Sequence, residues 1–242
     1  MEQAITTDKY EILQEDFIEV YGEKLYRIRT LKSFAGLDKG ELGGYIKMLK
    51  NLDQSGDAWV YGDARVYGNA RVSGDARVSG DARVSGNARV YGNARVSGNA
   101  RVSGDAQVYG NAWISGDAQV YGDARVYGNA WMYGDAWISG DARVSGDARV
   151  SGNAQVYGNA WISGNAQVYG QMDIITVLDI GSERGCLTIH RDSEIGVRVT
   201  RGCFTGSIGE FIEAVESTHG DNIHGKIYKS LIETAKIQFG IE

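Results

Sequence analysis

A six-residue repeat dominates this sequence and constrains its fold more than any other feature. Each copy reads Ser or Tyr, Gly, Asp or Asn, Ala, then Arg, Gln or Trp, then Val, Ile or Met. The repeat occurs 19 times without an insertion between Ser55 and Val168, and a degenerate copy follows at 169–174. Repetition at a fixed period indicates a solenoid or a related repeat architecture.

The spacing inside each copy predicts a short strand followed by a corner. Ala and the aliphatic residue are two positions apart, so in an extended segment they point to the same side. The Arg, Gln or Trp between them points to the other side. Gly followed by Asp or Asn suits a tight turn with positive φ. Three such corners close a triangular coil made of three copies, with Ala and the aliphatic residue inside.

The composition excludes several other classes of protein. The chain of 242 residues has 34 glycines and no proline, which excludes collagen and proline-rich linkers. A hydrophobic content of 43% is too high for a typical disordered chain. No apolar run is long enough to cross a membrane, and the acidic N-terminus does not resemble a secretory signal. With two cysteines, a reducing cytoplasmic location is expected, in a bacterial host if the gene is phage-borne.

One relation between neighbouring copies carries a family resemblance. An aliphatic residue is followed four positions later by a small one, as in Val60 to Ala64 and Val66 to Ala70. This resembles the left-handed parallel β-helix of the hexapeptide-repeat superfamily. The resemblance implies a mainly β fold with about 18 residues per coil and about six coils over residues 55–174. The resemblance also implies a homo-oligomer, typically a trimer. The superfamily includes both acyltransferases and proteins without known activity.

The two ends of the chain are expected to cap this solenoid. In residues 1–54, the segments 17–21 and 24–29 flank Gly22-Glu23 and predict a β-hairpin. Residues 175–242 predict a small α+β module, with strands near 174–180, 186–191 and 196–204.

Two helices should complete the C-terminal module. Ser207 and Glu210 form a capping box for the first helix, Gly220 ends it, and Asn222 caps the second. Each helix has a predicted apolar stripe. The stripe residues are Ile208, Phe211, Ile212 and Val215 in the first helix, and Ile223, Ile227, Leu231 and Ala235 in the second.

Segments in both ends carry a second resemblance. Leu42-Gly43-Gly44-Tyr45-Ile46, followed by Asn51-Leu52 and the repeats, resembles uncharacterised bacterial and prophage proteins labelled as transferases. The segments 201–206 and 218–222 resemble C-terminal modules of phage-associated proteins with the same repeat. The resemblance implies a phage or prophage source, and it implies a fold more than a reaction.

The residue types in the solenoid favour binding over catalysis. Between Ser55 and Val168 there is no His, Cys, Glu or Lys, so the usual general base and the usual zinc ligands are missing. No cofactor and no metal is therefore predicted. The enzyme alternative is an acyltransferase whose base comes from the C-terminal module, with His219 and Asp221 as candidates. A placement of His219 at a helix C-terminus explains it equally without catalysis. Cys186 and Cys203 form either a redox pair or two separate thiols.

A run of arginines without acidic neighbours is the sharpest binding candidate. Arg83, Arg89, Arg95 and Arg101 occur in consecutive copies, on successive sides of the triangle, and so form a collar. Arg83 and Arg101 are three copies apart, which is one full coil, and should stack. The collar predicts a site for an anionic ligand or an acidic partner. The alternative is that each Arg pairs with an Asp of a neighbouring coil. A net charge of −6 makes nucleic acid an unfavourable partner.

Aromatic residues gather towards the C-terminal end of the repeats and predict an interface. Trp113 and Trp131 are also one full coil apart and should be neighbours on one face. The other candidates for this oligomer or partner interface are Trp137, Trp161, Tyr127 and Tyr133.

Together these features predict a non-enzymatic binding protein that forms homo-oligomers. It would act by sequestering a host protein or a small anionic ligand, with interference in a host defence as one role. Two alternatives stay open, namely a hexapeptide-class acyltransferase and a structural or assembly component. No membrane association is expected.

Overall fold

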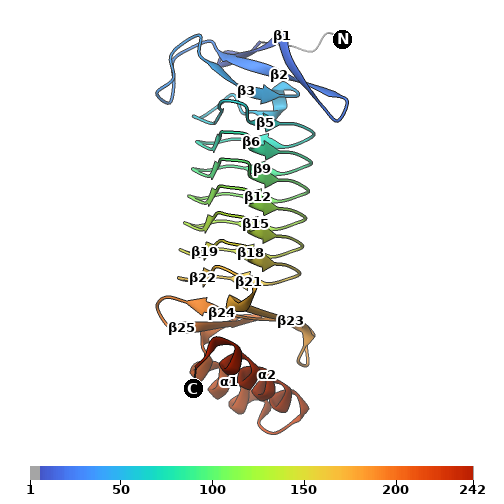
Figure 1. The fold of residues 1–242 in the computed structure, drawn as a ribbon, viewed down its shortest axis with the longest axis vertical. Coiled ribbons are helices and arrows are strands. Elements are labelled where there is room, and N and C mark those ends of the chain that lie inside the picture. Colours follow the sequence, from blue (N-terminus) through green and yellow to red (C-terminus); the bar gives the residue numbers. More distant parts are fainter. Residues whose placement is uncertain (1–5, 242) are drawn as a thin grey trace.

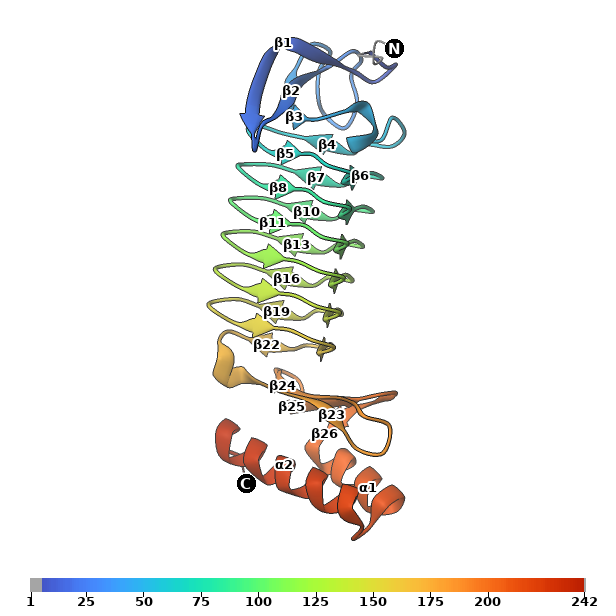
Figure 2. The ribbon, with the colours of Figure 1, turned by 90° about the vertical axis from the view of Figure 1, so that its right-hand side faces the viewer.

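The molecule is a long triangular β-solenoid with a different cap at each end (Figures 1 and 2). The computed structural model describes residues 6–241. Each coil has three short parallel strands, and strands in equivalent positions of successive coils pair in register to form three flat faces. The predicted mainly β fold, with a hairpin at its start and a small sheet and helix module at its end, is confirmed.

Three parallel sheets form the faces, which we number 1 to 3. Face 1 contains β3 (Leu42–Ile46), β5 (Arg65–Val66), β8 (Arg83–Val84), β11 (Arg101–Val102), β14 (Gln119–Val120), β17 (Trp137–Ile138) and β20 (Gln155–Val156). Face 2 contains β6 (Arg71–Val72), β9 (Arg89–Val90), β12 (Gln107–Val108), β15 (Arg125–Val126), β18 (Arg143–Val144) and β21 (Trp161–Ile162). Face 3 contains β4 (Trp59–Val60), β7 (Arg77–Val78), β10 (Arg95–Val96), β13 (Trp113–Ile114), β16 (Trp131–Met132), β19 (Arg149–Val150) and β22 (Gln167–Val168).

The solenoid has about seven turns, one more than the repeats alone predict. The additional turn comes from residues before the first copy. Strand β3 pairs in parallel with β5, and Leu52 forms a parallel bridge with Val72. A segment without the repeat pattern can form a turn here because backbone hydrogen bonds, which do not depend on the side chain, hold the coils together.

The alternation inside each copy explains the core and the corners. The repeat Ala and aliphatic residues are fully buried, and they form one continuous column through the solenoid. All 19 repeat glycines have φ between 58° and 73°, as the corner prediction requires. Gly104 shows a second constraint, because a Cβ atom there would lie 2.9 Å from the backbone nitrogen of Gly122 in the next coil. The corner therefore needs glycine for its backbone conformation and for close stacking.

An antiparallel hairpin extends face 1 at the N-terminal end. It consists of β1 (Tyr10–Val20) and β2 (Glu23–Thr30), and β2 pairs with β3. The short 3-10 helix η1 (Leu49–Asn51) follows β3. This hairpin confirms the turn predicted at Gly22-Glu23, although both of its strands are longer than expected.

A four-stranded antiparallel sheet and two helices cover the C-terminal end. After the 3-10 helix η2 (Gln171–Asp173) come β23 (Ile174–Ile180), β24 (Gly185–Asp192), β25 (Gly196–Arg201), β26 (Phe204–Ser207), α1 (Ile208–His219) and α2 (Ile223–Phe239). The sheet lies between the last coil and the helices (Figures 1 and 2). The predicted capping box of Ser207 and Glu210 is present, and Asn222 caps α2.

The buried side of α2 differs from the predicted stripe. Ile223 and Ile227 are exposed, whereas Tyr228, Ile232, Ala235 and Phe239 are buried. The sequence prediction was wrong for Ile223 and Ile227, whereas Ala235 is buried and Leu231 packs against the core as predicted. The error arises because α2 is apolar on two sides, and the hydrophobic pattern alone does not rank them. Tyr228 packs edge-on against Phe211 of α1, with ring centroids 5.5 Å apart, so the side with the larger aromatic residues is the buried one.

Candidate ligand-binding groove

The four collar arginines lie on three different faces. Arg83 and Arg101 pair in register on face 1, as their spacing predicts. Arg89 belongs to face 2 and Arg95 to face 3. Because the faces of a triangular prism point in different directions, a small ligand reaches at most two of the four side chains. The structure therefore divides the predicted collar between three surfaces.

The repeat arginines form no ion pairs with the repeat aspartates. Within residues 6–241, no repeat arginine lies within 4.0 Å of a carboxylate oxygen. The corner residues instead bond along their own columns: Asn87 donates to Asp105 at 3.0 Å, and Asn129 donates to Asp147 at 2.9 Å. The alternative in which each Arg pairs with an Asp of a neighbouring coil thus does not describe this molecule. These guanidinium groups are available for a ligand or a partner.

Face 2 carries two hollows that adjoin each other and form one groove. The upper hollow has a volume of about 470 Å³ and the lower one about 440 Å³, and both are lined by Asp123 and Arg125. The middle row of this face consists of Arg71, Arg89, Gln107, Arg125, Arg143 and Trp161. The corner row beside it consists of Asn69, Asn87, Asp105, Asp123, Asp141 and Asn159. The groove thus has guanidinium groups beside carboxylate and amide groups.

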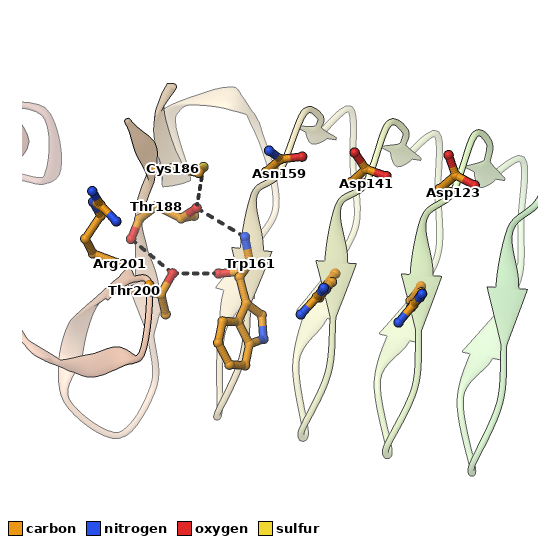
Figure 3. Close-up of a pocket in the computed structure, with 12 residues that line it drawn as sticks. Asp123, Asp141, Asn159, Trp161, Cys186, Thr188, Thr200 and Arg201 are labelled. Atoms are coloured by element: carbon orange, nitrogen blue, oxygen red, sulfur yellow. Dashed lines mark hydrogen bonds between the residues drawn. The ribbon is translucent and has the colours of Figure 1, made fainter. Parts of the chain in front are cut away.

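The C-terminal sheet closes the lower end of the groove. Figure 3 shows Cys186, Thr188 and Thr200 beside the last coil, next to the row of Asp123, Asp141 and Asn159. Two threonines hold this sheet in place. The hydroxyl of Thr188 accepts from the backbone N–H of Trp161 at 3.1 Å, and the hydroxyl of Thr200 donates to the Trp161 carbonyl at 3.0 Å.

Arg201 lines the lower hollow, but its guanidinium group points away from the coils (Figure 3). Its Nε donates to the hydroxyl of Tyr228 of α2 at 3.0 Å, and its Nη2 donates to the carbonyl of Ile180 at 2.8 Å. These two bonds hold the side chain on the helix side of the sheet. Thr200, its neighbour on β25, points to the solenoid side instead. The guanidinium groups that this hollow offers to a ligand are therefore those of Arg125 and Arg143.

Cys186 lines the same hollow but is not an activated nucleophile. Burial raises the pKa of its thiol, and its Sγ lies 3.7 Å from the hydroxyl of Thr188. A thiol with a raised pKa is largely protonated near neutral pH. Cys203 is exposed, and the two cysteines are both free. The possible redox pair is therefore absent.

The histidines of the C-terminal module do not form a hydrogen-bonded catalytic group. The rings of His219 and His224 lie side by side, with centroids 5.8 Å apart. The carboxylate of Asp221 instead accepts from Lys229 at 3.2 Å. Across residues 6–241, no three His, Cys, Asp or Glu side chains gather in a way that could hold a metal ion.

The aromatic residues form ladders on different faces. Trp113 and Trp131 stack on face 3, with centroids 5.1 Å apart, as their spacing predicts. Trp137 lies on face 1 and Trp161 on face 2. Tyr133 packs against Trp131 at 5.2 Å. Tyr127 instead continues a second ladder with Tyr91 and Tyr109.

Comparison with known protein families identifies the repeat. Ten segments match the model described as the YdcK beta solenoid repeat. The solenoid is built from repeats similar to YdcK β-solenoid repeats. The matched segments are residues 58–74, 64–80, 70–86, 76–92, 82–97, 94–106, 118–134, 136–152, 142–155 and 154–170. All of these YdcK-type matches lie between residues 58 and 170, so they cover the solenoid and neither of the two end modules.

A comparison with curated proteins finds no match to the chain. In the part of the chain that the structure covers, neither helix is long and apolar enough to span a membrane.

The sequence analysis missed Arg125 and Arg143 as candidate site residues. These two arginines occupy the same position in successive coils, so a comparison of residues along one face would have found them together. The search along successive copies instead selected arginines from different faces. Nothing in the repeat places Thr188 and Thr200, because they belong to the C-terminal sheet and reach the last coil through tertiary packing.

Proposed function

We propose that this protein is a non-enzymatic binding protein that holds a small anionic ligand in the groove of face 2. The observation that carries the proposal is the pair Arg125 and Arg143 in one hollow, with no carboxylate paired to either arginine within residues 6–241. Unpaired guanidinium groups in a concave site favour carboxylate or phosphate ligands, which accept two parallel hydrogen bonds from each fork.

The spacing of the two solenoid arginines suits a compact anion. Arg125 and Arg143 are paired residues on neighbouring strands, which lie about 4.8 Å apart in a sheet. Two guanidinium groups at that separation can contact oxygens of the same phosphate or carboxylate group.

The acidic wall of the groove limits the charge of the ligand. Asp123 and Asp141 lie in the corner row beside the two arginines, so a long polyanion would meet repulsion along its length. The net charge of −6 acts in the same direction. A small anion that also carries hydroxyl or amino groups fits this mixture better than nucleic acid does.

The groups that line the lower hollow support binding rather than covalent catalysis. They supply hydrogen-bond donors and acceptors, and their one thiol is kept protonated by burial. On the sequence resemblance, we also propose a phage or prophage setting in a bacterial cytoplasm. Sequestration of an anionic ligand or an acidic host protein would there interfere with a host defence.

Calorimetric titration with inorganic pyrophosphate and with citrate at low salt tests the proposal. We expect binding by the natural chain, and about a 100-fold loss in Arg125→Gln/Arg143→Gln, since each lost ion pair costs about tenfold in affinity. Asp141→Asn should bind about threefold more tightly, because it removes a negative charge beside the ligand.

The matched control is Arg83→Gln/Arg101→Gln. This pair is also one coil apart, but it lies on face 1 and lines neither hollow. It should bind both probes as the natural chain does. The proposal fails if neither probe binds, or if the two double variants lose equal affinity.

A further inference from the structure

Helix α2 presents an uncharged, largely apolar stripe to solvent at the C-terminal end of the molecule. Ile223, Ile227 and Ile237 are 66%, 39% and 84% exposed, and Ser230 and Thr234 between them are exposed as well. We call these five residues the outer stripe. Tyr228, Ile232, Ala235 and Phe239 are buried on the other side of the helix, against the sheet and α1. The outer stripe therefore lies on the side of α2 that faces away from the core of the module.

The spacing of the outer stripe is the spacing of a helix–helix seam. Its members follow one another at intervals of four, three, four and three residues. This alternation keeps side chains on one line of an α-helix and is the a/d pattern of paired helices. Two stripes with apolar residues on opposite sides of one helix indicate that the helix packs against two neighbours, and residues 6–241 cover only one of the two stripes.

The side chains in the middle of the outer stripe are small, and those at its two ends are large. Ser230 is the central residue, and the isoleucines lie on either side of it. The hydroxyl of Thr234 donates to the carbonyl of Ser230 at 3.0 Å, so it needs no partner from outside the helix. Small residues where two helices cross allow close approach, and larger residues then pack on both sides of the crossing.

The charges around the outer stripe fit a second copy of the same chain. Lys226 borders the stripe, and Glu213 is exposed on the outer side of α1. Neither forms an ion pair within residues 6–241. In a two-fold arrangement each copy offers both charges to the other, as a self-complementary interface requires.

We propose that the outer stripe of α2 binds the outer stripe of a second copy, giving a dimer that joins two solenoids at their C-terminal ends. Both helices form the outermost layer at that end, beyond the sheet, and the N-terminal cap lies at the far end (Figures 1 and 2). The groove of face 2 lies on the solenoid side of the sheet, so dimerisation and anion binding use different surfaces.

Light scattering after size-exclusion chromatography tests the proposal on the full chain. We expect twice the chain mass of 26.3 kDa for the natural protein, and the mass of one chain for Ile227→Glu/Ile237→Glu. Both changed side chains are exposed, so the variant should fold, and an unchanged circular dichroism spectrum would verify this. Ile195→Glu is the matched control, because Ile195 is 38% exposed but lies outside both helices. It should remain a dimer.

A cross-link locates the contact directly. Ser230→Cys, in a Cys203→Ser background that removes the exposed native thiol, should form a disulfide between two chains under mild oxidation. The proposal is overturned by a natural chain with the mass of a monomer. It is also overturned by an oligomer that survives Ile227→Glu/Ile237→Glu, or by one that dissociates only when Trp113 and Trp131 are replaced by serine.

Discussion

The two ends of the solenoid are closed by different chemistry. Where strands meet corners, backbone N–H groups donate to a carbonyl of the following coil, as from Arg95 to Ala112 at 2.9 Å. For these bonds, the first coil has carbonyls without donors, and the last coil has N–H groups without acceptors. At the first coil, Lys9 Nζ donates to the carbonyl of Ala58 at 2.8 Å, and the Tyr10 hydroxyl donates to that of Leu52 at 3.0 Å.

The C-terminal cap supplies several acceptors and also donors. The hydroxyl of Thr188 accepts from Trp161 N–H, and the carboxylate of Asp173 accepts from the N–H groups of Tyr169 and Gly170 at 2.9 and 3.1 Å. The hydroxyl of Thr200 donates to the Trp161 carbonyl. Because an unpaired buried backbone group is costly, the two ends use different side chains to satisfy the outermost coils, and the two caps should respond to pH in different ranges.

The largest expected effect is acid destabilisation of the C-terminal cap through His190. This side chain is fully buried, and burial lowers its pKa from 6.5 to about 4. Since the unfolded chain binds the proton more readily, stability is lost as pH falls from 6.5 towards 4, by about 3 kcal/mol. Hydrogen exchange should show amides of β24 and β25 opening over this range, while those of β1 and β2 stay protected.

His190→Gln is the control for the acid effect. The carboxylates of the chain are present in both proteins. The difference between the two profiles of stability against pH therefore reports the contribution of His190. Parallel profiles would show that the buried imidazole does not couple the C-terminal cap to pH.

The N-terminal cap should respond in alkali, where a rise in pH above neutrality stabilises the fold. Burial lowers the pKa of Lys9 from 10.5 to about 8, so above pH 8 the folded chain loses a proton that the unfolded chain retains. Stability therefore rises with pH, by about 2 kcal/mol at a pH of about 9.5. The neutral amine still donates to both carbonyls that it contacts. Urea unfolding of Lys9→Met should lack this rise, and a rise of equal size in the variant would contradict the assignment.

An intermediate effect is expected from one acceptor of the C-terminal cap. Thr188→Val keeps the shape of the side chain but leaves the N–H of Trp161 without an acceptor, which should cost about 1.5 kcal/mol. Thr176→Val is the matched control, because Thr176 lies opposite Thr188 on β23 and its hydroxyl forms no hydrogen bond within residues 6–241. Equal unfolding free energies for the two variants would show that the Thr188 hydroxyl does not stabilise the C-terminal cap.

The smallest effect should come from the solenoid wall, where polar contacts are exposed. Asn129 accepts from Asn111 and donates to Asp147, both at 2.9 Å. Asn129→Ala should cost about 0.5 kcal/mol, since water replaces both bonds. Asn153→Ala, whose side chain forms no hydrogen bond within the structure's residues 6–241, should cost less. A loss from Asn129→Ala as large as that from Thr188→Val would break the distinction between wall and cap.

The sequence predicts the solenoid well because every copy occupies an equivalent position in the structure. Each inward Ala and Val meets the same residues one coil away, so local alternation and global packing agree, as for Val102 beside Val84 and Val120. The same period predicts the stacking of Trp113 on Trp131. The groove was less predictable, because Thr188 and Thr200 close its lower end from a module without the repeat.

The amino-acid sequence by itself determined the coil, its three faces, the glycine corners and the caps of both helices, since each follows from short-range spacing and backbone stereochemistry. Only the tertiary structure decided which side of α2 is buried, which arginines share a groove, and how the ends are closed. These depend on the position of the end modules against the solenoid, and that position is set by long-range contacts such as those of Thr188 and Lys9. Periodicity carries no information about such contacts, because each occurs once in the chain.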